Sequence, residues 1–136
     1  MKLEDLQVYQ ISMKLADEVH DLVMEWDNFH KFSTGTQLVN AADSVSANIS
    51  EGYGRFHFKD HKNFLYFSRG SLSETKTWLT KAVNRKLITE EKFSDLIKQY
   101  NSLGVKLNNY INTIGNSVNA NDHECLLNDN QMTTNV

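Results

Sequence analysis

The chain has no proline among its 136 residues, and this absence constrains its fold more than any other feature. Proline lacks a backbone N–H, ends or kinks helices, and is common in turns between strands. Its absence, with only six glycines, favours long uninterrupted helices over a sandwich of short strands. A chain of this length fits one domain. We therefore expect a single all-α domain.

Apolar residues recur at steps of three and four in four segments, the pattern of amphipathic helices. Short links between them predict an antiparallel up-down-up-down four-helix bundle over residues 1–114. Residues 115–136 are polar and rich in asparagine, and we expect them to form a disordered tail. The four predicted helices run from Asp5 to Phe29, from a cap at Ser33 or Thr34 to Gly52 or Gly54, from Lys59 to Arg85, and from a cap at Thr89 to Ile114.

Charge is distributed unevenly along the chain, although the net charge is only −3. Residues 1–54 carry three basic and nine acidic side chains (−6), and residues 55–106 carry eleven basic and five acidic ones (+6). Three interpretations stay open: a solvated surface, acidic and basic faces that meet between subunits of a ring, and a nucleic-acid surface. Phe56, Phe58 and Tyr66 are candidates to stack on bases. The candidate basic contacts are Arg55, Lys59, Lys62, Arg69, Lys81, Arg85 and Lys86.

The expected location is the cytoplasm. Cys125 is the single cysteine, so no internal disulfide can form, which suits a reducing compartment. The start of the chain lacks the pattern of a signal peptide. No apolar run approaches the ~20 residues that span a bilayer, so we expect no membrane contact.

No catalytic or metal-binding motif is found. A di-iron bundle needs Glu-x-x-His pairs on two helices, whereas Asp17-x-x-His20 and Asp27-x-x-His30 lie on one helix and carry Asp. His57 and His61 are four residues apart but lack an evident third ligand. We interpret them as ordinary polar residues at a helix start. The sequence predicts no enzyme, no metal and no cofactor.

One polar cluster stands out in the second and third predicted helices. Asn48 and Glu51 are three residues apart, as are Ser71 and Glu74, so each pair shares a helix face. Two facing carboxylates could hold a metal or share a proton. The alternative is structural: a hydrogen-bonded network between these helices, or a contact between subunits. The cluster consists of Gln37, Asn48, Glu51, Arg69, Ser71 and Glu74.

These segments carry a resemblance. The chain has Gln37-Leu38, Ala41, Ser44, Asn48-Ile49 and Glu51-Gly52, then Gly70-Ser71 and Glu74. This pattern is similar to that of the four-helix bundle proteins encoded in intervening sequences of 23S ribosomal RNA genes, over residues 3–115. The resemblance implies a bundle that assembles into a ring, commonly a pentamer. It also implies a relation to accessory proteins of diversity-generating retroelements, which bind a reverse transcriptase and nucleic acid.

Two functional hypotheses follow. The first is a non-enzymatic, self-assembling scaffold or adaptor that binds a protein or ribonucleoprotein partner, a reverse transcriptase being one candidate. The second is an accessory protein that binds RNA or DNA directly through the basic second half of the chain.

Overall fold

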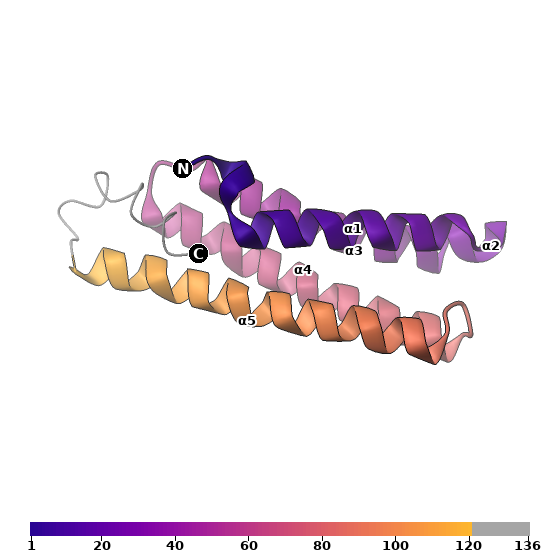
Figure 1. Cartoon of the computed structure of the whole chain (residues 1–136). Helices are drawn as coiled ribbons and strands as arrows, with labels where there is room; N and C mark the ends of the chain where they lie inside the picture. Colours follow the sequence, from indigo (N-terminus) through magenta and orange to yellow (C-terminus); the bar gives the residue numbers. More distant parts are fainter. Residues whose placement is uncertain (121–136) are drawn as a thin grey trace.

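The computed structural model describes the backbone of residues 1–120 and the side chains of residues 1–114. Residues 1–120 form helices and no strands. Four long helices lie alongside one another (Figure 1): α1 (Gln7–Met24), α3 (Thr34–Tyr53), α4 (Phe58–Asn84) and α5 (Glu90–Ala120). The 3-10 helix η1 (Leu3–Asp5) precedes α1, and the short α2 (Asn28–Lys31) precedes α3. None of the described helices is long and apolar enough to cross a bilayer.

Each long helix packs against two others. Helix α1 contacts α3 and α5, and α4 contacts the same two helices, so α1 and α4 lie across the bundle from each other. The apolar stripes meet in one core, because burial of such stripes is what stabilises an amphipathic helix in a protein. Its largest fully buried apolar side chains include Leu6, Leu15, Leu38, Ile49, Phe58, Leu65, Leu79, Leu96, Leu103 and Leu107.

The first predicted helix, from about Asp5 to Phe29, starts within two residues of the observed helix but ends too late. Helix α1 starts at Gln7 and stops at Met24. Asp27 then starts α2, because its carboxylate accepts a hydrogen bond from the backbone N–H of His30 at 3.1 Å. An aspartate that caps a new helix competes with continuation of the old one. Phe29 was expected on the apolar stripe, and it is 75% exposed instead.

The other predicted helices are present, with two differences at their ends. Thr89 caps α5 as predicted, since its hydroxyl accepts from the backbone N–H of Lys92 at 3.0 Å. Ser33 does not cap α3, because its hydroxyl donates to the Phe29 carbonyl at 2.6 Å. Helix α5 continues past the predicted end at Ile114 to Ala120. The remainder of the predicted disordered tail, 121–136, lies outside the described residues.

Helices α3 and α4 approach each other closely. A Cβ added at Gly52 would lie 3.0 Å from both the His61 carbonyl oxygen and the Phe64 Cβ. Further along, the buried hydroxyl of Ser68 donates to the Val45 carbonyl at 2.7 Å. At the far end, the Arg85 guanidinium donates to the Thr34 hydroxyl at 2.8 Å. The end of α3 therefore lies beside the start of α4, and the start of α3 lies beside the end of α4.

His61, interpreted from the sequence as an ordinary polar residue at a helix start, is buried in the core. Its side chain is 3% exposed, and its Nε2 lies 3.4 Å from the Tyr110 hydroxyl of α5. Burial disfavours the charged imidazolium and lowers the pKa of His61 to about 4. His57, by contrast, is exposed and sits just before the first residue of α4.

The contact at Gly52 predicts opposite outcomes for two glycine substitutions. Gly52→Ala should lower the free energy of unfolding by about 1–3 kcal/mol, because the new methyl group meets backbone that cannot easily move. Gly70→Ala is the matched control, since a Cβ there has nothing within 4 Å. It should raise stability by roughly 0.5–1 kcal/mol through helix propensity. Urea unfolding measures both, and equal effects would contradict the close approach.

The buried His61 predicts a pH dependence of stability. The folded pKa, about 4, lies below the unfolded value of about 6.5, so the unfolded chain binds the extra proton first. Stability should therefore fall as pH drops from about 6.5 to 4, by at most roughly 3 kcal/mol. His61→Gln should remove this part of the slope, measured by urea unfolding across that pH range. His57→Gln retains the buried His61 and should keep the wild-type slope.

Candidate functional site: the outer face of α3 and α4

The motif residues gather on one outward face made by α3 and α4. On α3 its members are Gln37, Ser44, Asn48 and Glu51, and on α4 they are Phe64, Phe67, Ser71, Glu74 and Trp78; all are exposed or half-buried. Their steps of three, four and seven keep them on one side of each helix. Because Gly52 meets Phe64 and a pocket joins Gln37 to Trp78, the two rows lie along each other. We call these nine residues the motif face.

The hydrogen bonds of the motif face join residues four apart in the chain and do not cross between α3 and α4. Asn48 Nδ2 donates to the Ser44 carbonyl at 2.8 Å, and Trp78 Nε1 donates to Glu74 at 3.3 Å. Glu51 pairs with Arg55 at 2.8 Å. Of the alternatives for this cluster, the network between the second and third helices is not formed within one copy of the described chain, where Ser68 and Arg85 make the α3–α4 side-chain bonds. A contact between subunits stays a prediction.

Arg69 does not belong to this face. Its Nη1 donates to Asn108 Oδ1 of α5 at 3.0 Å, and its guanidinium carbon lies 4.9 Å from the centre of the Tyr66 ring. The sequence grouped Arg69 with Ser71 because they are neighbours in the chain. Two positions along a helix turn the side chain by about 200°, so Arg69 reaches α5 instead.

The two motif carboxylates are far apart. Ser68 meets Val45, and this register puts Glu51 beside Lys62, twelve residues before Glu74. At 1.5 Å per residue, Glu51 and Glu74 are separated by about 18 Å along the bundle. They can neither share a proton nor hold one metal ion. Within the described part of the chain, no group of three or more His, Cys, Asp or Glu side chains is placed to bind a metal.

Several basic residues of the predicted nucleic-acid surface lie over aromatic rings of the chain itself. Lys62 Nζ lies 5.9 Å from the centre of the Tyr66 ring, which Arg69 also covers. Arg55 lies 4.7 Å from the centre of the Phe64 ring, and Lys81 lies 5.7 Å from that of Trp78. Such cation–π contacts stabilise a charged side chain at the surface.

The remaining residues of the predicted nucleic-acid surface fall into different environments. Lys59 is exposed on α4, and Lys86 lies just past the end of that helix with a left-handed backbone, φ 62°. Phe56 is 61% exposed and can reach a ligand. Phe58 is 2% exposed and belongs to the core, so its predicted stacking role is wrong.

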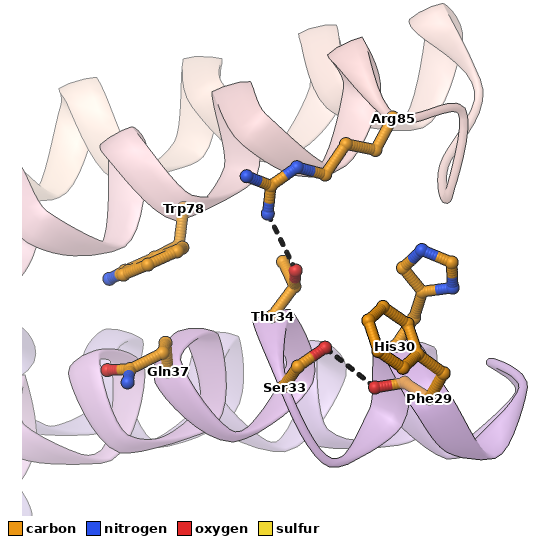
Figure 2. A pocket seen from close by; sticks show the side chains of 7 residues that line it. All are labelled: Phe29, His30, Ser33, Thr34, Gln37, Trp78 and Arg85. Carbon is orange, nitrogen blue, oxygen red and sulfur yellow. Dashed lines mark hydrogen bonds between the residues drawn. The ribbon is translucent and has the colours of Figure 1, made fainter.

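A pocket of about 420 Å³ lies at one end of the motif face. Figure 2 shows Trp78 and Arg85 reaching from α4 toward Ser33, Thr34 and Gln37 at the start of α3. Phe29 and His30 of α2 form the outer wall. The Arg85–Thr34 hydrogen bond holds the guanidinium in this corner. The pocket therefore combines aromatic rings, one cation and an amide.

Sequence analysis did not find this pocket, although two signals were present. Trp78 lies off the apolar stripe of its helix, which marks it for a surface role. Phe29 follows Asp27, a residue that favours helix starts, so a break before Phe29 was readable. What the sequence lacks is the α3–α4 register that brings Gln37 beside Trp78.

Comparisons with known proteins agree with the motif resemblance. A solved structure of a protein of unknown function from the S23 ribosomal protein family of Bacteroides thetaiotaomicron VPI-5482 is similar, with a TM-score of 0.74. It is 24% identical, and the alignment covers 82% of this chain and 99% of that chain, so the likeness concerns the fold. A comparison with curated proteins finds no match. The family model described as 23S rRNA-intervening sequence protein matches residues 4–109. The chain therefore belongs to the 23S rRNA-intervening sequence protein family.

Proposed function

We propose that this protein is a non-enzymatic, self-assembling scaffold or adaptor. In this proposal the four long helices run up-down-up-down, and copies of the bundle pack head to tail into a cytoplasmic ring, with a pentamer as the expected size. The ring presents a surface to a protein or ribonucleoprotein partner. One observation carries the proposal: exposed acidic residues of α1 and exposed lysines of α4 lie on helices that are diagonal in the bundle.

The acidic side belongs to α1. Asp17, Asp21 and Glu25 are exposed on this helix, and a hollow of about 320 Å³ lies between α1 and α3 beside them. Asp43 lines this hollow with Asp17. Burial raises the pKa of Asp43, the negative charge of Asp17 raises it further, and His20 opposes the shift. A cation beside Asp43 would stabilise its charged form, which burial disfavours.

The basic side belongs to α4, which lies across the bundle from α1. Lys59 and Lys62 flank its first turns, and Phe67 is an exposed apolar side chain nearby, 58% accessible. When two different faces of one chain are complementary, the contact is heterologous and repeated copies close into a ring if the rotation allows. The small Ser46 and Ala47 in the acidic hollow would admit an approaching helix.

Charge reversal tests this assembly. Asp17→Lys/Asp21→Lys and Lys59→Glu/Lys62→Glu should each weaken self-association about tenfold or more, because each places like charges against each other. Mixing the two variants should restore pairing between unlike copies, since the two reversed faces attract each other. The mixture should give oligomers with an even number of subunits, because the two variants cannot alternate around a ring of five. Sedimentation velocity at low salt measures both effects. Lys98→Glu changes an exposed charge on α5 and should have no such effect. Unchanged association in both double variants would overturn the head-to-tail contact.

The alternative function is direct binding of RNA or DNA. The exposed cations of α4 and the end of that helix favour it, together with the exposed Phe56 and the 38% exposed Tyr66. It has less support, because Phe58 is buried and Arg55, Lys62, Arg69 and Lys81 already stack on rings of the chain itself.

The alternative makes a distinct prediction. Arg85→Gln/Lys86→Gln should weaken binding of a labelled single-stranded RNA and lower the slope of log K against log salt by about 1.4. The matched control is Lys2→Gln/Lys14→Gln, which neutralises two cations in the acidic half. Fluorescence anisotropy across a salt series measures both. If wild-type protein binds no RNA or DNA even at low salt, this alternative is excluded.

A further inference from the structure

We propose that the pocket lined by Phe29, Trp78 and Arg85 is a recognition site for a carboxylate of a partner protein, carried next to an aromatic or aliphatic side chain. The site is separate from the acidic hollow and the basic turns of α4 that the ring proposal uses. Binding here does not require assembly, so either proposal can fail without the other.

Arg85 supplies the anion-binding group. Its Nη1 donates to the Thr34 hydroxyl at 2.8 Å, and Thr34 is 4% exposed, so a buried group orients the guanidinium. Arginine has five N–H donors in a planar fork that matches a carboxylate. No carboxylate of the described residues pairs with Arg85. Arg85 lines the pocket, and within the described residues only its Nη1 makes a hydrogen bond, so its other donors are available to a ligand.

The rings supply the apolar part of the site. Phe29 is 75% exposed on α2, and Trp78 stands on the opposite wall (Figure 2). Single exposed apolar residues are ordinary at a surface, but here two rings border one concave space beside a fixed cation. A ligand whose apolar group fills the space between them would shield both rings from water.

The charges around the rim favour one negative charge over several. Glu74 accepts from Trp78 Nε1, and Asp27 pairs with His30 at 2.8 Å. These carboxylates offset Arg85 and Lys81, so the rim is close to neutral before a ligand arrives. A single carboxylate needs only the one cation at Arg85, whereas the several negative charges of a phosphate chain would be repelled by the nearby carboxylates of Glu74 and Asp27. A peptide carboxylate therefore fits better than a nucleic-acid backbone.

The probe for this site is N-acetyl-L-phenylalanine, which carries one carboxylate beside one aromatic ring. A two-dimensional ¹H–¹⁵N NMR titration of the full chain should shift the amide signals of Thr34 and Gly35 and the indole signal of Trp78. N-acetyl-L-phenylalaninamide has the same ring without the charge and should bind at least about tenfold more weakly, as expected for loss of a charge-assisted hydrogen bond. Equal binding of acid and amide, or shifts confined to other residues, would overturn the proposal.

Variants of the protein and a second ligand test the charge of Arg85 and the class of anion separately. Arg85→Gln keeps a donor near Thr34 but removes the charge, and it should abolish the preference for the acid over the amide. Arg55→Gln removes a cation at the other end of the motif face and should leave that preference intact. Phenyl phosphate tests the anion class: tighter binding of the phosphate than of the carboxylate would also contradict the proposal. Unchanged signals elsewhere in the Arg85→Gln spectrum verify its fold. If this folded variant still prefers the acid over the amide, the proposal is wrong.

Discussion

The close approach of α3 to α4 is the constraint on which the rest of this structure depends. Gly52 has no side chain, and only this lets the α3 backbone come within contact distance of His61 and Phe64. The Ser68 hydroxyl then reaches the Val45 carbonyl and satisfies a buried polar group that would otherwise destabilise the core. Together these contacts determine how the two helices align along their length.

This alignment decides which residues meet the core and which meet solvent. Leu38, Ile49, Leu65 and Leu79 are buried. The polar residues of the motif face stay outside and bond to residues four apart in the chain. The stability of such a core comes from well-packed apolar side chains more than from buried polar networks. Of the aromatic residues of this face, Phe67 is 58% exposed and Trp78 is partly buried against the core. The same alignment creates the pocket, since it brings the start of α3 to the end of α4.

Sequence reasoning predicted the helices well where periodicity alone decides them and failed where local or tertiary contacts compete. The steps of three and four located α3, α4 and α5, because a long apolar stripe has few other ways to be buried. The break before Asp27 was missed, since periodicity through Phe29 outweighed one capping residue. The burial of His61 was also missed, because its polar side chain is accommodated by Tyr110, a residue forty-nine positions away. The separation of Glu51 from Glu74 depends on register, which no single-helix pattern contains.

The proposal that copies of this bundle associate rests on the opposite charges of α1 and α4, which lie diagonally across the bundle. Native mass spectrometry of the wild-type protein at micromolar concentration and low salt tests that claim most directly. The account predicts one discrete closed oligomer, five times the subunit mass for the expected pentamer, free of nucleic acid and dissociating as salt rises. A strictly monomeric protein under these conditions would contradict it.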